Sequence, residues 1–149
     1  MSYSFEEVVM DFVPLFEGEL RYTALESLDY EAGGQLYGTM VGEVTGERLT
    51  GSFQLTNLAQ RRSDNVNCPT LRGLLTTDDG ATAYVEWDGL ATLRPADQAR
   101  VFVTSITFRT GDSRYTWLNT AVGVVEGVLD SVSVGGSARL RAYTCEATI

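Results

Sequence analysis

The stretch LLTTDDGATAYVEWDG, Leu74 to Gly89, decides the fold class of this chain. Thr, Tyr, Val and Trp surround its central Asp79-Gly80 pair, and such β-branched and aromatic residues suit a pleated sheet. Asp-Gly is a favoured two-residue hairpin turn, because both residues tolerate the positive φ that a type I′ turn requires. The stretch therefore predicts an antiparallel hairpin, in which a two-residue turn pairs Arg72 with Trp87.

The adjacent carboxylates Asp78 and Asp79 have a catalytic and a structural interpretation. A catalytic acid–base pair needs two side chains that converge in a site of low dielectric constant. Neighbours in a strand cannot converge, since they point to opposite faces of the sheet. We therefore interpret Asp79 as a turn residue and Asp78 as its solvent-exposed neighbour.

The period of two recurs along the chain, in short segments that Gly, Asp and Ser separate. The clearest segments are Val101–Arg109, Ser113–Asn119 and Ser137–Cys145. Turn signals follow one another about every dozen residues, a spacing typical of an antiparallel sandwich or barrel. The sequence thus predicts an all-β, antiparallel fold.

The two faces of the predicted hairpin favour a barrel over a sandwich. One face carries Arg72 beside Trp87, and the other carries Glu86 beside Tyr84, so neither face is purely apolar. The core of a sandwich is usually apolar, whereas a barrel that encloses a ligand has polar groups in its interior. We therefore expect an antiparallel β-barrel with a cavity.

Three segments interrupt the strand pattern. Ser4–Phe12 contains a candidate capping box, and Arg94–Arg100 has a proline at a candidate first helical position, so each predicts one or two helical turns at most. The polar segment Asn57–Pro69 is either a mobile lid or a surface connection. We expect one β-barrel domain over residues 1–149, with residues 1–13 as a short helix or arm.

Composition and charge exclude several partners. The formal net charge of −9 and the isoelectric point near 4.4 disfavour binding to nucleic acid, because like charges repel. No apolar run approaches the ~20 residues of a membrane-spanning helix, and the first residues do not resemble a signal peptide. We therefore expect a cytoplasmic protein that binds neither nucleic acid nor a membrane.

The residue types that are absent also limit the chemistry. The chain has no histidine and no lysine, which excludes serine–histidine triads, cysteine–histidine dyads, lysine Schiff bases and the P-loop lysine. Its two cysteines, Cys68 and Cys145, are too few for a disulfide framework and are interpreted as buried thiols. The sequence predicts no metal and no cofactor.

Three segments in order, TTDDGATAYV, FRTGDSRYTWLN and ARLRAYTC, resemble the bacterial and fungal family called domain of unknown function 3237. The resemblance extends over roughly residues 15–145. It implies a small antiparallel β-barrel similar to the allene oxide cyclase-like and calycin-like barrels, and it implies no established activity. The chain departs from the family before Arg72, where NLAQRRSDNVN replaces a segment that resembles G-x-D-W-Q.

The cavity-lining residues follow from alternation along the predicted strands. In Ser113–Asn119, alternation places Tyr115, Trp117 and Asn119 on one face, which is either core or pocket. The amide of Asn119 favours a pocket, because a buried amide needs several hydrogen-bond partners.

Arg72 has a similar pair of interpretations. A strand arginine usually lies on the outer face, but an inward Arg72 beside Trp87 would offer a fixed cation to a carboxylate or an enolate. The predicted site therefore has Tyr115 and Arg72 as catalytic residues that polarise a bound oxygen. Its predicted ligand-binding residues are Trp117, Asn119 and Trp87.

Two functions of different classes are compatible with this site. The first is a cofactor-independent enzyme of the cyclase, isomerase or lyase type, which acts on a small, largely apolar metabolite inside the barrel. The second is a non-catalytic barrel that binds or carries a hydrophobic small molecule. In both cases the predicted partner is a small hydrophobic metabolite, and the sequence leaves open whether the chain forms a homo-oligomer.

Overall fold

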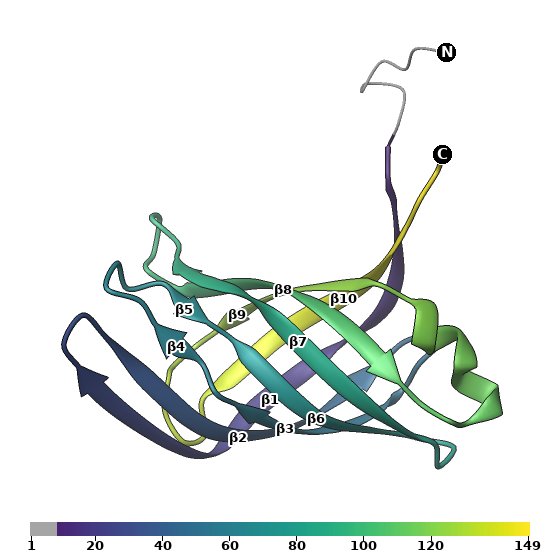
Figure 1. Ribbon diagram of the computed structural model, residues 1–149, viewed down its shortest axis with the longest axis horizontal. Helices are drawn as coiled ribbons and strands as arrows, with labels where there is room; N and C mark the ends of the chain where they lie inside the picture. The colour runs from purple at the N-terminus through teal and green to yellow at the C-terminus, as the bar shows by residue number, and fades with distance from the viewer. Residues whose placement is uncertain (1–8) are drawn as a thin grey trace.

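The computed structural model describes residues 9–149 and shows a closed antiparallel β-barrel of eight strands (Figure 1). The barrel strands are β1 (Asp11–Tyr30), β2 (Gly33–Thr45), β3 (Gly51–Asn57), β6 (Thr70–Thr77), β7 (Thr82–Leu93), β8 (Arg100–Arg109), β9 (Gly123–Leu129) and β10 (Ser137–Glu146). The other elements are the two-residue strands β4 (Gln60–Arg61) and β5 (Asn67–Cys68) and the 3-10 helix η1 (Ser113–Thr120). The predicted all-β, antiparallel barrel is confirmed.

The barrel closes because β1 pairs with strands on both of its sides. Around the barrel the order is β1, β10, β9, β8, β7, β6, β3 and β2, and every pairing is antiparallel. β1 bends around two neighbours, and its register shifts between Pro14 and Phe16 and again between Tyr22 and Ala24. Such bulges bend a strand and increase its twist, which closure of a barrel requires.

The two predicted helical segments differ in outcome. Residues 4–8 of the first lie outside the described residues, and its end belongs to a strand, since β1 begins at Asp11. The expected arm over residues 1–13 is therefore wrong for residues 11–13. In the second segment the amide of Gln98 donates to the carbonyl of Arg94 at 2.7 Å, which forms a single turn.

The hairpin between β6 and β7 is present, but its turn has three residues instead of the predicted two. The amide of Thr77 donates to the carbonyl of Ala81 at 2.8 Å, and the amide of Gly80 donates to the carbonyl of Thr77 at 3.1 Å. Gly80 has a φ of 90°, as expected for the last residue of such a loop. In this register Arg72 pairs with Glu86, so the predicted pairing of Arg72 with Trp87 is wrong.

A one-residue change of register turns one strand's side chains to the opposite face. The inner face of the hairpin is consequently apolar, with Leu71, Leu75, Ala83, Val85 and Trp87 all buried. The polar groups on which the expected cavity rests lie on the outer face of the hairpin. They are therefore no reason to expect a cavity, although the barrel itself is present.

Gly80 provides a direct test of the turn. Replacement of Gly80 by valine should lower the free energy of unfolding by about 1–2 kcal/mol, because a β-branched residue is strained at positive φ. The matched control is Gly111→Val, since a Cβ atom would meet no atom within 4 Å at either position and only Gly80 has a positive φ. Urea unfolding of both variants measures the difference, and equal losses would contradict the assigned turn.

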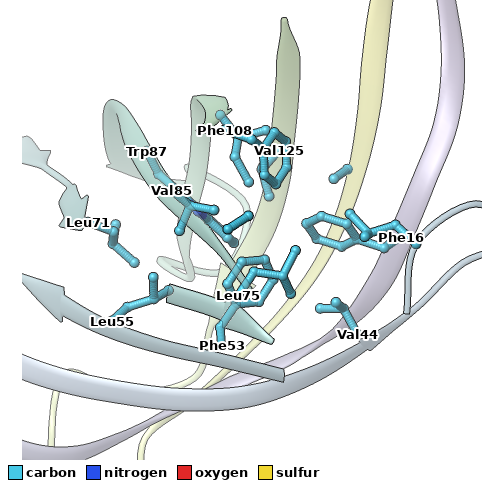
Figure 2. Close-up of a cluster of buried hydrophobic side chains, with 14 of the residues drawn as sticks. Phe16, Val44, Phe53, Leu55, Leu71, Leu75, Val85, Trp87, Phe108 and Val125 are labelled. Carbon is cyan, nitrogen blue, oxygen red and sulfur yellow. The ribbon is translucent and has the colours of Figure 1, made fainter. Parts of the chain in front are cut away.

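Large apolar side chains from all eight barrel strands form a core inside the barrel (Figure 2). Phe16, Phe53 and Trp87 form an aromatic cluster with ring centroids 5.3–6.4 Å apart. Tyr115 and Leu118 of η1 are buried and belong to the same core. This end of the barrel is therefore packed, and space for a ligand must lie towards the other end.

Candidate functional site

A cavity of about 50 Å³ lies in the other half of the barrel. Its position follows from β8, because Arg100, Phe102 and Thr104 at the start of this strand line the cavity, whereas η1 follows the strand's end. The apolar walls come from strands all around the barrel and include Leu20, Leu36, Met40, Leu71, Phe102 and Leu129.

The segment Asn57–Pro69 forms part of the barrel wall at this end. Its strand β4 pairs with β2 and its strand β5 pairs with β7, where Asn67 lies opposite Ala91 (Figure 1). Asn57, Asn67 and Pro69 also contribute to the cavity lining. The segment thus continues the barrel wall between β2 and β7 beyond the ends of β3 and β6, which is more than the plain surface connection of one sequence interpretation.

Three buried polar atoms of the cavity lining have no hydrogen-bond partner among the described residues. They are Nε1 of Trp87, Oγ1 of Thr104 and Oδ1 of Asn67, in residues that are 1%, 2% and 8% exposed. Leaving such an atom unpaired costs about 1–3 kcal/mol. Two donors and one acceptor are therefore available to a polar molecule in this cavity.

Tyr22 adds a fourth polar group to the wall. Its buried hydroxyl accepts a hydrogen bond of 2.9 Å from Nδ2 of Asn57, whose Oδ1 in turn accepts from the amide of Thr70. The orientation of the Asn57 amide is thereby fixed, and the proton of Tyr22 remains free to be donated. Burial raises the pKa of Tyr22, and the weaker opposing effect of Asn57 does not cancel this rise. Tyr22 is consequently a neutral phenol and a hydrogen-bond donor.

The ring of Tyr22 has room only because the neighbouring strand β2 has a glycine, Gly38, beside the ring. A Cβ atom on Gly38 would lie 2.8 Å from Cε1 of Tyr22 and 3.1 Å from Cδ1 of Leu25. Any side chain at this position would displace the ring. Gly38 therefore fixes the place of the phenol in the wall.

Arg100 brings a positive charge to the same cavity. Its NH1 donates to the carbonyls of Asn65 at 2.8 Å and of Ala91 at 3.3 Å. No carboxylate of the described residues lies within 4.0 Å of its guanidinium group. Partial burial lowers the pKa of Arg100, although the group stays charged at neutral pH.

Of the five residues that the sequence predicted for the site, only Trp87 lines this cavity. Arg72 lies on the outer face, where its NH2 contacts both carboxylate oxygens of Asp88 at 3.0–3.1 Å and its Nε lies 3.6 Å from Glu86. The predicted inward orientation of Arg72 is therefore wrong, because it depended on the shifted register.

The other three predicted residues belong to η1 and not to a strand. Tyr115 and Leu118 are buried at a spacing of three, which is the period of a 3-10 helix. Trp117 is half-buried, with the guanidinium carbon of Arg48 5.0 Å from its ring centroid. Asn119 is exposed, and its side chain forms two hydrogen bonds with the backbone of Thr110. Its Oδ1 accepts from the amide at 2.7 Å, and its Nδ2 donates to the carbonyl at 2.9 Å. The predicted shared face of Tyr115, Trp117 and Asn119 is therefore wrong.

Tyr115 binds the hairpin turn at the packed end of the barrel. Its hydroxyl donates to the carboxylate of Asp79 at 2.9–3.0 Å, and Asp79 also accepts from Thr77 and lies 3.4 Å from NH1 of Arg114. The interpretation of Asp79 as a turn residue is confirmed, and Asp79 has the further contact with η1. Tyr115 and Trp87 are thus not brought together in the cavity.

The contacts of Asp79 and Asp112 predict that the packing of η1 against the barrel becomes less stable at acid pH. The Thr77 hydrogen bond and then Tyr115 lower the pKa of Asp79, and Arg114 lowers the pKa of Asp112 to about 2 from an ordinary value of 3.8. The folded state binds fewer protons than the unfolded state, so this stabilisation is complete above about pH 4 and is lost towards pH 2. Tryptophan fluorescence should report loosening around Trp117 over this range. Asp112→Asn should weaken the pH dependence, and an unchanged profile would contradict the contribution of Asp112.

Sequence reasoning missed Tyr22, Asn57, Asn67, Arg100 and Thr104. The available signal was a polar residue on a face that is otherwise apolar, such as Thr104 between Phe102 and Ile106. That signal is weak, because the other face of β8 also carries apolar residues, including Val101 and Val103. The sequence therefore does not show which face of β8 points inward.

Within residues 9–149, no group of three or more cysteine, aspartate or glutamate side chains is gathered as metal ligands would be. Cys68 and Cys145 are partly buried free thiols. None of the helical structure described is long and apolar enough to cross a membrane.

Comparison with protein families identifies the chain. The family model described as "Protein of unknown function (DUF3237)" matches residues 31–144, which include most of the barrel and all the described polar groups of the cavity except Tyr22. The chain belongs to this family. A search of curated proteins found no match to this DUF3237 chain.

Solved structures share the fold of this DUF3237 barrel. A β-barrel-like protein from Acinetobacter baumannii AYE superposes with a TM-score of 0.79 at 22% identity, over 96% of this chain and 100% of that chain. A conserved protein of unknown function from Rhodopseudomonas palustris gives 0.77 at 19% identity, over 92% and 98%. An enzyme from Penicillium herquei gives 0.71 at 20% identity, over 98% and 100%. At these identities the likeness shows the fold alone.

Proposed function

We propose that this DUF3237 barrel binds a small, largely apolar metabolite in its cavity and acts on it as a cofactor-independent cyclase, isomerase or lyase. The observation that supports the proposal is the position of the three unpaired polar atoms, of Trp87, Thr104 and Asn67, on the wall of one apolar cavity. Pockets that orient a ligand combine apolar walls with a few such groups.

The cavity residues suit a reaction in which negative charge develops on an oxygen atom. Apolar walls would hold the carbon skeleton in one conformation, which removes part of the entropic barrier. Trp87, Thr104 and Tyr22 would donate hydrogen bonds to the oxygen as its charge grows. Tyr115 and Arg72 have no part in this proposal, because they lie away from the cavity. The Penicillium herquei structure, described as an enzyme, supports catalysis on this fold.

A non-catalytic carrier is the second candidate, and one observation favours it. None of the described residues that line the cavity is an aspartate or a glutamate, and the raised pKa of Tyr22 keeps this phenol protonated, so that it cannot accept a proton. A reaction that needs a strong base is therefore not supported, whereas a carrier needs no base.

Binding and turnover can be measured together on a panel of small, largely apolar ketones and acids of the size that the cavity admits. Protein NMR shifts would report binding, and mass spectrometry would report products isomeric with the substrate or cleaved from it. Ala138→Leu, which fills the cavity from β10, should abolish binding. Binding that persists in this variant would contradict the cavity as the site, and binding without any product would favour the carrier.

Tyr22→Phe separates the two candidates further. If the barrel is an enzyme, loss of the hydroxyl should lower kcat by about 100-fold with a smaller change in KM. The matched control is Tyr37→Phe on the exposed face of β2, which should leave turnover unchanged. Equal turnover by the two variants would show that the Tyr22 hydroxyl takes no part in the reaction.

A further inference from the structure

We infer that the metabolite is a short oxo acid, whose carboxylate binds Arg100 while its carbonyl oxygen binds Trp87 and Thr104 deeper in the cavity. This inference rests on the proposed function, and it names the class of ligand that the cavity selects. Charge, distance and hydrogen-bonding character each support it.

Arg100 is the charged side chain of the described cavity lining. Arg72, Arg109 and Arg114 all have carboxylate partners in the barrel, whereas the partly buried Arg100 contacts only backbone carbonyls through its NH1. A partly desolvated guanidinium group gains more from a bound carboxylate than an exposed one does. In a chain of net charge −9, this cation at the cavity is a specific attraction for one anionic group.

The distances limit the ligand to a short molecule. Arg100, Phe102 and Thr104 alternate on the inner face of β8, and NH1 of Arg100 reaches the carbonyl of Ala91, which pairs with Phe102. The guanidinium group therefore lies about two residues from Thr104, or roughly 7 Å along the strand. The cavity of about 50 Å³ holds about four water molecules, which corresponds to a short chain or part of a ring.

The deeper polar groups specify the second oxygen. The indole N–H of Trp87 can only donate, and the hydroxyl of Thr104 has no acceptor among the described residues. Tyr22 also has its proton free. Several donors that converge on one cavity favour an acceptor without a proton, and a carbonyl oxygen meets that requirement.

Three probes of similar length separate these contributions: 4-oxopentanoate has both groups, pentanoate has only the carboxylate, and 2-pentanone has only the carbonyl. Dissociation constants measured by protein NMR should show 4-oxopentanoate binding about tenfold more tightly than either of the others. Arg100→Gln should weaken the binding of both acids and leave the binding of 2-pentanone unchanged, which also shows that the variant is folded. Thr104→Val should weaken the two carbonyl probes only.

The control for charge is Arg139→Gln, an exposed arginine of β10, which should leave all three affinities unchanged. Equal losses in the Arg139 and Arg100 variants would indicate a general effect of charge and overturn the inference. If 2-pentanone binds and the acids bind no better, the inference fails while the proposed cavity stands. If none of the three probes binds, both the inference and the proposed function fail.

Discussion

Replacement of Trp87 by alanine should lower the free energy of unfolding by about 3–5 kcal/mol, as large-to-small changes of a buried aromatic residue do. Trp87 is 1% exposed, and its ring lies 5.3 Å from that of Phe53 and 6.4 Å from that of Phe16. It joins the packed half of the barrel to the cavity wall, so its loss would extend the cavity into the core. Urea unfolding would measure the change.

Trp87→Phe is the matched variant, because it keeps an aromatic ring and removes the N–H group. It should lose far less stability than the alanine variant, since most of the contact with Phe53 remains. A loss below about 1 kcal/mol for Trp87→Ala would contradict the central place of this residue in the core.

Replacement of Leu118 by alanine should lower the free energy of unfolding by about 2–5 kcal/mol. Leu118 is fully buried and, with Tyr115, inserts η1 into the end of the barrel. Thr116→Ala is the control, because Thr116 is exposed on the same helix. Thermal unfolding of both variants measures the difference, and similar small losses would show that η1 merely lies on the surface.

The sequence predicted the barrel and its hairpin but not the hairpin's register. Two-residue and three-residue turns are both compatible with Asp78-Asp79-Gly80, and local propensity does not distinguish them. The structure selects the register that buries Leu71 and Leu75 inside the barrel, so burial over the whole strand decides the turn. Arg72 was assigned to the wrong face for this reason alone.

The segment Ser113–Asn119 was wrongly predicted as a strand because its residue types are typical of strands. Asp112 overrides that preference, since its side chain accepts from the amide of Arg114 at the start of η1. A spacing of three between Tyr115 and Leu118 was visible in the sequence. A short segment offers only one such repeat, and the alternation of Tyr115, Trp117 and Asn119 is an equally visible pattern in the same residues.

The cavity could not be assembled from the sequence. Its polar groups come from five separate strands, β1, β3, β5, β7 and β8, and no single strand shows them as a set. Only closure of the barrel brings them together. Trp87 is predicted as the neighbour of Arg72, a pairing that is wrong, and it nevertheless belongs both to the core and to the cavity wall.

Closure of the barrel also has a consequence for how the chain folds. The seam between β1 and β10 pairs Asp11 with Glu146, so it joins strands from opposite ends of the described chain. Contacts between residues so distant in sequence form late, because the loop between them must first lose its freedom. During synthesis one edge of β1 therefore stays unpaired until β10 has left the ribosome, and in that interval it can pair with another nascent chain.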